Sequence, residues 1–152
     1  MNTLYIRVNQ FDELPDLSSL INLISFAIEN NQFTFEDIEP NMSFSDESFT
    51  YSPQVDVGIK IDTVLEIGEN YTMSVTVGGA NNAYQWYKDD IMLPEATSDS
   101  YQLSSIAIDD SGSYICRVTN DIVPDLTISG QSIHLTVVDP TGISEVDITH
   151  PK

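Results

Sequence analysis

The run Asp110-Ser-Gly-Ser-Tyr-Ile-Cys116 places the only cysteine of the chain thirty residues after its only tryptophan, Trp86. Around it, apolar and polar residues alternate, as in Thr72-Met-Ser-Val-Thr-Val77 and Ser132-Ile-His-Leu-Thr-Val137. Segments rich in Gly, Asn and Asp separate these stretches and favour turns. Several short strands with such turns between them predict an all-β sandwich or barrel over residues 59–139.

The same stretches resemble the immunoglobulin superfamily, especially its intermediate and variable-like sets. Residues 84–90 resemble strand C with its core tryptophan, residues 100–106 resemble strand E, and residues 110–116 resemble the E–F corner and strand F. The resemblance implies an antiparallel sandwich in which Trp86 is buried rather than exposed for stacking on a ligand. It also implies that the Tyr114 hydroxyl bonds back to the upstream backbone. Tyr87, which alternation turns outward, is then a candidate contact residue.

The strand B position that would pair with Cys116 in this family is occupied by Val75. We therefore expect Trp86, Tyr114, Cys116 and Val75 to form the structural core, with no disulfide. Cys116 is interpreted as a small buried apolar residue with an inert thiol. The alternative, a reactive or metal-binding cysteine, lacks a second Cys or a His nearby in the sequence.

The first 38 residues contain a repeat with an offset of 22, and its matched positions are Leu4/Phe26, Ile6/Ile28, Asn9/Asn31 and Phe11/Phe33. Leucines every three residues connect the two copies, from Leu14 to Leu23. The copies resemble the leucine-rich repeat pattern, in which a short strand, a turn asparagine and further apolar residues form each coil. The alternative is a pair of amphipathic segments that share a spacing.

The second copy departs from the leucine pattern, and we interpret it as the last coil before a cap made by Ile38, Phe44 and Phe49. About three repeats are needed for a stable array. We therefore expect the chain to be the C-terminal part of a longer array whose upstream repeats are missing, or to pair through its first strand.

Composition favours a folded, β-rich protein and argues against some classes of partner. Hydrophobic residues make up 41% of the chain, enough for a core, but 24 Asp and Glu against 5 Lys and Arg give a net charge of −19. Such a field repels phosphate backbones and anionic lipids, so nucleic acid is a poor candidate partner. The sequence shows no membrane-spanning stretch and no signal peptide. This leaves either a cytoplasmic protein or a piece whose export signal lies upstream.

Catalytic chemistry finds little support in the sequence. His134 falls on the outward face of the last strand and His150 in the tail, and neither has a nucleophile beside it. The acidic pairs are Asp46-Glu47, Asp89-Asp90 and Asp109-Asp110, whose spacing does not match a calcium loop. We interpret them as solvated turns, with calcium binding as the alternative. We predict no enzyme, no cofactor and no metal.

These observations predict a mainly β protein: leucine-rich-repeat coils and cap at 1–50, a linker at 51–58, the immunoglobulin-like domain at 59–139 and a tail at 140–152. The resemblance to bacterial surface or secreted leucine-rich repeat proteins implies an extracellular or cell-surface module for adhesion or protein recognition. The outward strand positions Tyr5, Arg7, Ala27 and Glu29 would form its concave face, and residues 78–82 and 120–130 adaptable loops. The alternatives are a carbohydrate-binding module, for which only Tyr87 is a plausible aromatic, and a rigid spacer.

Overall fold

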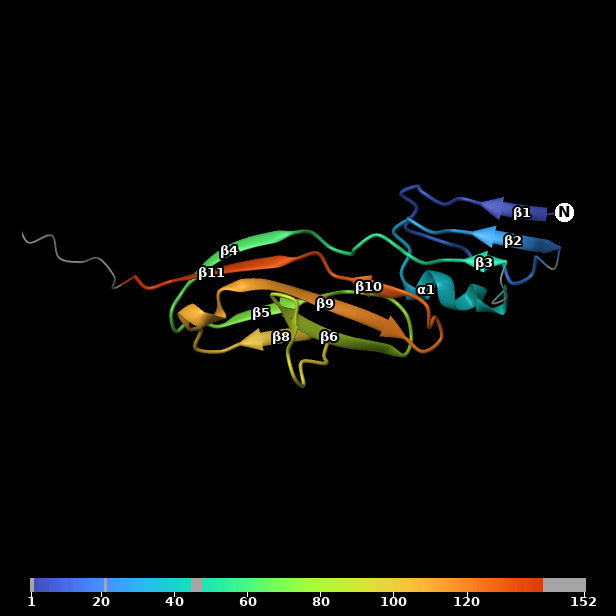
Figure 1. Ribbon diagram of the computed structural model, residues 1–152. Helices are drawn as coiled ribbons and strands as arrows, with labels where there is room; N and C mark the ends of the chain where they lie inside the picture. Colours follow the sequence, from blue (N-terminus) through green and yellow to red (C-terminus); the bar gives the residue numbers. More distant parts are fainter. Residues whose placement is uncertain (1, 21, 45–47, 141–152) are drawn as a thin grey trace, which may run out of the picture.

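A computed structural model describes residues 2–20, 22–44 and 48–140 of the chain (Figure 1). A small parallel sheet lies at the N-terminal end, and two further sheets contain the remaining strands. Asp46, Glu47, His150 and the predicted tail beyond Pro140 lie outside the described residues.

The N-terminal sheet contains three parallel strands, β1 (Asn2–Tyr5), β2 (Leu23–Ala27) and β3 (Phe49–Thr50). Leu4 lies beside Phe26 in the register of β1 and β2, so the 22-residue offset found in the sequence is a spatial register. Phe49 had been expected only to cap the coils. It instead begins a third strand beside Phe26.

A ladder of side-chain amides holds the three coils together. The Asn31 amide nitrogen donates to the carbonyl oxygens of Ile6 and Ile28, both at 2.9 Å, and its oxygen accepts from the Phe11 backbone N–H at 3.2 Å. The Asn31 backbone N–H in turn donates to the side-chain oxygen of Gln54 at 3.0 Å. Gln54 thus takes the place of asparagine in the third coil. Residue 51 was expected to begin a linker, but Gln54 bonds to the second coil across a 23-residue spacing that differs from the 22-residue offset of the first two copies.

The cap closes the downstream side of these coils. Helix α1 (Phe35–Ile38) buries Phe35 and Ile38, and the short 3₁₀ helix η1 (Glu39–Phe44) follows it directly. The Phe26 and Phe49 rings stack with centroids 4.8 Å apart, and the Phe44 ring meets both edge-on. Ile38 is therefore buried, and Phe44 packs against the Phe26 and Phe49 rings.

Two sheets form the sandwich that follows. The larger sheet has the order β4-β11-β9-β6-β7 with β10 on β9, and the smaller one pairs β5 with β8. Their bounds are β4 (Ile61–Glu66), β5 (Tyr71–Ser74), β6 (Asn82–Lys88), β7 (Ile91–Met92), β8 (Ser100–Leu103), β9 (Gly112–Asn120), β10 (Thr127–Ser129) and β11 (Ile133–Val138). A 3₁₀ turn, η2 (Ile108–Asp110), precedes β9.

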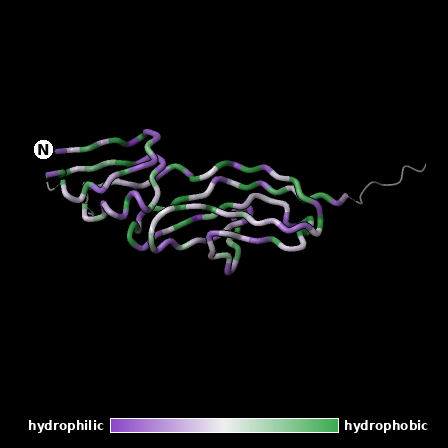
Figure 2. The backbone as a smooth tube through the Cα atoms, turned by 180° about the vertical axis from the view of Figure 1, so that it is seen from behind, coloured by the Kyte–Doolittle hydropathy of each residue, from purple (hydrophilic) through white to green (hydrophobic). Residues whose placement is uncertain are grey.

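The strand order confirms the predicted immunoglobulin-like sandwich over the alternative of a closed barrel. In the immunoglobulin lettering, β5 is strand B, β6 is C, β8 is E, β9 is F and β11 is G. Strands C, F and G therefore lie in one sheet, and strands B and E lie in the other. One pair departs from the antiparallel expectation, since β4 runs parallel to β11. Figure 2 shows the alternation of apolar and polar residues along the strands. On β11 the side chains of Ile133, Leu135 and Val137 are buried, whereas that of His134 is exposed.

The core of the sandwich contains Trp86, Tyr114 and Cys116, three of the four residues that the sequence singled out, whereas Val75 is only partly buried. Trp86 and Cys116 are register partners, each 1% exposed. The Tyr101 ring from the smaller sheet lies 6.2 Å from Trp86 and 6.3 Å from Tyr114 between ring centroids. The Tyr114 hydroxyl donates to the Asp110 carbonyl at 2.8 Å, which is the predicted corner bond.

We predict that replacing Asn31 with Ala destabilises the chain far more than replacing Asn9. Asn31 is fully buried, and its loss leaves the Phe11 N–H without its partner and removes one of the two side-chain donors from each of the Ile6 and Ile28 carbonyls, which should cost about 1–3 kcal/mol. Asn9 is exposed and bonds within its own turn, so Asn9→Ala should cost less than about 1 kcal/mol. Urea unfolding of both variants measures the difference. Equal midpoints would show that the ladder does not hold the coils.

Candidate recognition site

The exposed face of the coil sheet carries an aromatic and guanidinium pair. Tyr5 is 59% exposed, and its hydroxyl shares a 2.9 Å hydrogen bond with the Ser25 hydroxyl on the neighbouring strand. The Arg7 guanidinium lies over the Tyr5 ring, 5.9 Å from its centroid. The Tyr5 ring is therefore anchored at its hydroxyl by Ser25, and the Arg7 guanidinium lies over its face.

Two further residues expected on this face differ in their exposure. Ala27 is only 6% exposed, because its register neighbours Tyr5 and Thr50 flank its short side chain on both sides. Its expected place on the contact surface was therefore wrong. Glu29 is half-buried, and among the described residues its Oε2 atom is buried without a hydrogen-bond partner. We name the exposed Tyr5 and Arg7, together with the half-buried Ser25 and Glu29, the coil face.

On the sandwich, Tyr87 is covered rather than open. The Arg117 guanidinium lies 4.4 Å from the centroid of the Tyr87 ring and also approaches the Asp90 carboxylate at 3.5 Å. Tyr87 is consequently half-buried. Arg117 escaped the sequence reasoning, although alternation with buried Cys116 and Val118 places it on the same outward face.

The Cys116 side chain is buried in the core, with 1% of its surface exposed. Burial raises the pKa of the thiol to about 11, and a backbone hydrogen bond opposes the shift only partly. Burial also raises the pKa of Tyr114, with the Asp110 carboxylate as a second cause. Val75 is half-buried and lines a cavity of about 230 Å³ whose wall also includes Trp86 and Cys116. The fully buried residue of strand B is Met73.

The acidic pairs order turns in the described part of the chain. Asp89 accepts the Ser113 N–H at 2.9 Å, and Asp110 accepts the Ala107 N–H at 2.8 Å. Within residues 2–20, 22–44 and 48–140, no group of three or more His, Cys, Asp or Glu converges as a metal site would require. No helix in that part is long and apolar enough to cross a membrane.

The two segments predicted as adaptable loops are packed against the cap. The Glu39 carboxylate accepts hydrogen bonds from the Ala80 N–H at 2.7 Å and from the Asn120 amide at 2.8 Å. Asn120, Val123 and Leu126 are at most 3% exposed. The partner that these segments share, Glu39, lies 81 residues from Asn120 in the sequence, and no local pattern marks it.

The pair Gly78-Gly79 allows the two segments to approach the cap closely. We name this contact, between the cap residues Phe35–Glu39 and the segments at Gly78–Ala80 and Asn120, the junction. A Cβ atom on Gly79 would lie 2.6 Å from the Phe35 Cβ, and one on Gly78 would overlap the Glu36 side chain. Tyr51 adds a contact beside Asp125, where burial, followed by the charge of that carboxylate, raises the pKa of the tyrosine. The buried cores of coils and sandwich form one continuous cluster across the junction.

Comparison with known proteins gives distant structural similarities. No protein-family model matches the chain. The domain D1 of Duf (Kirre) is similar with 23% identity and a TM-score of 0.46, over 53% of this chain and 92% of that one. Drosophila OTK extracellular domains 3–5 are similar with 15% identity and a TM-score of 0.45, over 52% of this chain and 33% of that one. Sidekick-1 immunoglobulin domains 1–4 are similar with 19% identity and a TM-score of 0.46, over 55% of this chain and 21% of that one.

We predict that Cys116 does not react with a thiol reagent in the native protein at pH 8. With its pKa near 11 and 1% exposure, the thiolate is scarce and shielded, whereas the urea-unfolded chain should react at once. Because the native pKa lies above the ordinary value of 9.0, the unfolded state ionises first, and the free energy of unfolding should fall as pH rises from about 9 to about 11. Cys116→Val should reduce this fall. Rapid native labelling would contradict the burial.

We predict that Gly79→Val disrupts the junction while Gly68→Val does not. Both glycines have positive φ, +118° and +88°, so both variants strain the backbone, but only Gly79 faces neighbours within 4 Å. The excess cost should be about 1–3 kcal/mol. Hydrogen exchange should show faster opening of residues 23–44 in Gly79→Val alone. Equal exchange in the two variants would mean that the coils do not depend on this contact.

Proposed function

We propose that this chain is a non-catalytic recognition module that binds a protein ligand through the coil face, with the immunoglobulin-like domain as its rigid support. The coil unit extends through Gln54, and the sandwich occupies residues 59–139. We further propose that the coils belong to the leucine-rich repeat class, that further repeats stack on β1, and that the module works at the surface of, or outside, a bacterial cell.

The observation that carries this proposal is the exposed Tyr5 ring with Arg7 upon it. Tyrosine and arginine contribute most to protein interfaces, and a ring already held by Ser25 loses little conformational entropy on binding. The half-buried Glu29 carboxylate on the same face adds a negative charge that favours a basic group of the ligand. A protein ligand with an apolar centre and basic groups fits both features.

The net charge favours the same kind of ligand. A chain with a net charge of −19 accelerates the approach of basic surfaces and repels acidic ones. A ligand with a basic surface therefore gains in association rate. Because Arg117 already covers the Tyr87 ring, the sandwich offers little support for the alternative of a carbohydrate stacked on that residue.

We predict that protein ligands recovered by screening the full chain against purified extracellular proteins depend on the coil face. Tyr5→Ala and Arg7→Ala should each weaken binding at least tenfold, which corresponds to about 1.4 kcal/mol. Thr136→Ala, an exposed position on β11, is the matched control and should leave the affinity unchanged. Surface plasmon resonance measures all three.

A glycan array run in parallel separates the alternatives. Binding only to glycans, or to proteins with an affinity that Tyr5→Ala and Arg7→Ala leave unchanged, would overturn the proposal.

A further inference from the structure

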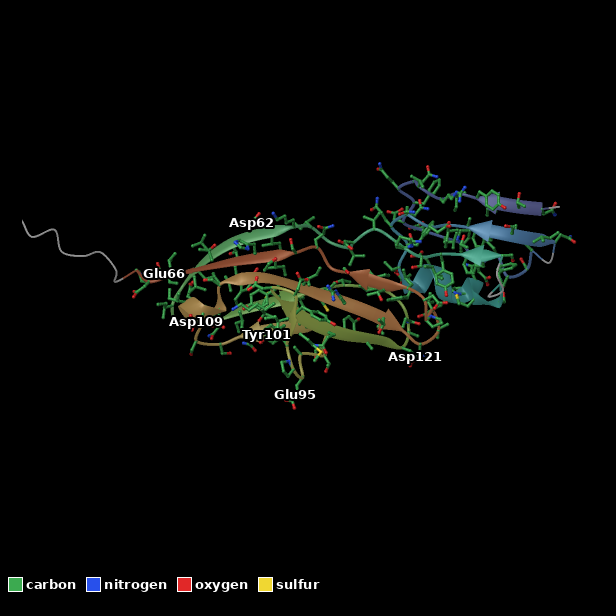
Figure 3. All side chains as sticks on the ribbon, viewed as in Figure 1. Asp62, Glu66, Glu95, Tyr101, Asp109 and Asp121 are labelled. Carbon is green, nitrogen blue, oxygen red and sulfur yellow. The ribbon has the colours of Figure 1, made fainter. Side chains whose placement is uncertain are left out.

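The smaller sheet of the sandwich has an uncharged open edge. It contains only β5 and β8, and the seven residues from Tyr71 to Val77 include no charged side chain. By contrast, β4 at the edge of the larger sheet carries charged side chains, Asp62 near its start and Glu66 at its end (Figure 3). Lys60, just before this strand, places its ammonium nitrogen 3.8 Å from the Asp62 carboxylate. Charged side chains on an edge strand discourage pairing with another strand, and β5 lacks this protection.

The hydrogen-bonding groups of this edge can be assigned from the ladder with β8. Val75 donates its backbone N–H to the Asp99 carbonyl at 2.9 Å, so Val75, Met73 and Tyr71 face β8 in the register. In an antiparallel pair the intervening residues point their N–H and C=O groups the other way. Those residues are Thr72, Ser74 and Thr76, which we name the β5 edge. No strand of the described residues pairs with it.

The space beside the β5 edge is also unfilled. Ser74, Val75 and Thr76 line the cavity of about 230 Å³, and Ile59, which lines it from the other side, is 78% exposed. Apolar surface so placed gains free energy when a neighbouring chain covers it. The cavity and the unpaired backbone N–H and C=O groups of the β5 edge therefore lie on the same side of the sandwich.

The sequence of the β5 edge is complementary to itself. When two copies run antiparallel about Ser74, this residue meets its own counterpart, and Thr72 of each copy meets Thr76 of the other. Cross-strand pairs of hydroxyl residues stabilise a sheet. Two chains of net charge −19 repel each other over their acidic surfaces, so an uncharged edge is the place where they meet at least cost.

We propose that a second copy of this chain binds at the β5 edge, in antiparallel register about Ser74. The pairing makes one four-stranded sheet, β8-β5-β5-β8, across the twofold axis. The two-stranded sheet thereby reaches a size that is more usual in stable proteins.

Sedimentation equilibrium of the full chain at increasing concentration tests this pairing. The wild-type chain should dimerise, and Ser74→Lys should weaken the association at least tenfold, because it places two like charges opposite each other. Thr136→Lys is the matched control, since it adds the same charge at an exposed hydroxyl residue of another strand. It should dimerise like the wild type. Because Ser74→Lys lowers the overall negative charge, a general charge effect would act in the opposite direction.

A crosslinking variant tests the register and does not depend on the lysine variant folding well. Residues opposite each other in a hydrogen-bonded antiparallel pair have Cα atoms about 5.5 Å apart, within the range of a disulfide. Ser74→Cys should therefore form a covalent dimer on oxidation, and Thr136→Cys should not.

A wild-type chain that stays monomeric, equal association of Ser74→Lys and wild type, or no crosslink through Ser74→Cys would each overturn the proposal. Tyr5→Ala should dimerise normally. Failure of self-association would therefore leave ligand binding by the coil face untouched, and the two proposals can fail separately.

Discussion

The packing of Trp86, Tyr101 and Tyr114 between the two sheets is the contact on which the sandwich depends. The chain has one cysteine, so no disulfide can join the sheets, and Tyr101 of the smaller sheet instead lies between two rings of the larger one. Burial of large aromatic side chains adds several kilocalories per mole to the free energy of unfolding, about as much as a disulfide would add. The same burial explains why the Cys116 thiol is protonated and unreactive.

The coils extend this core rather than form a separate one. Phe26 and Phe49 belong to the same apolar cluster as Trp86 and Val137, and Glu39 joins the cap to Ala80 and Asn120. The continuous core and the hydrogen bonds of Glu39 connect the coils to the sandwich. On the proposed function, a ligand bound at Tyr5 and Arg7 would spend little of its binding energy on ordering the protein.

The two proposed surfaces would act together. A dimer formed through the β5 edge carries two coil faces, each fixed to its own sandwich by the junction. Such a dimer binds a ligand with repeated sites more tightly than one chain does, because the second contact becomes intramolecular. The acidic surface supports this arrangement, since it discourages contacts of the copies at other faces.

The sequence by itself determined the features that follow from local periodicity. Alternation predicted the buried sides of β9 and β11, the 22-residue offset predicted the register of β1 with β2, and the corner motif predicted the bond of Tyr114. Only the tertiary structure decided the third coil at Gln54, the burial of the loops against Glu39 and the open edge at Ser74. These features join or separate residues far apart in the chain, such as Glu39 and Asn120, and such contacts leave no periodic trace in a single sequence.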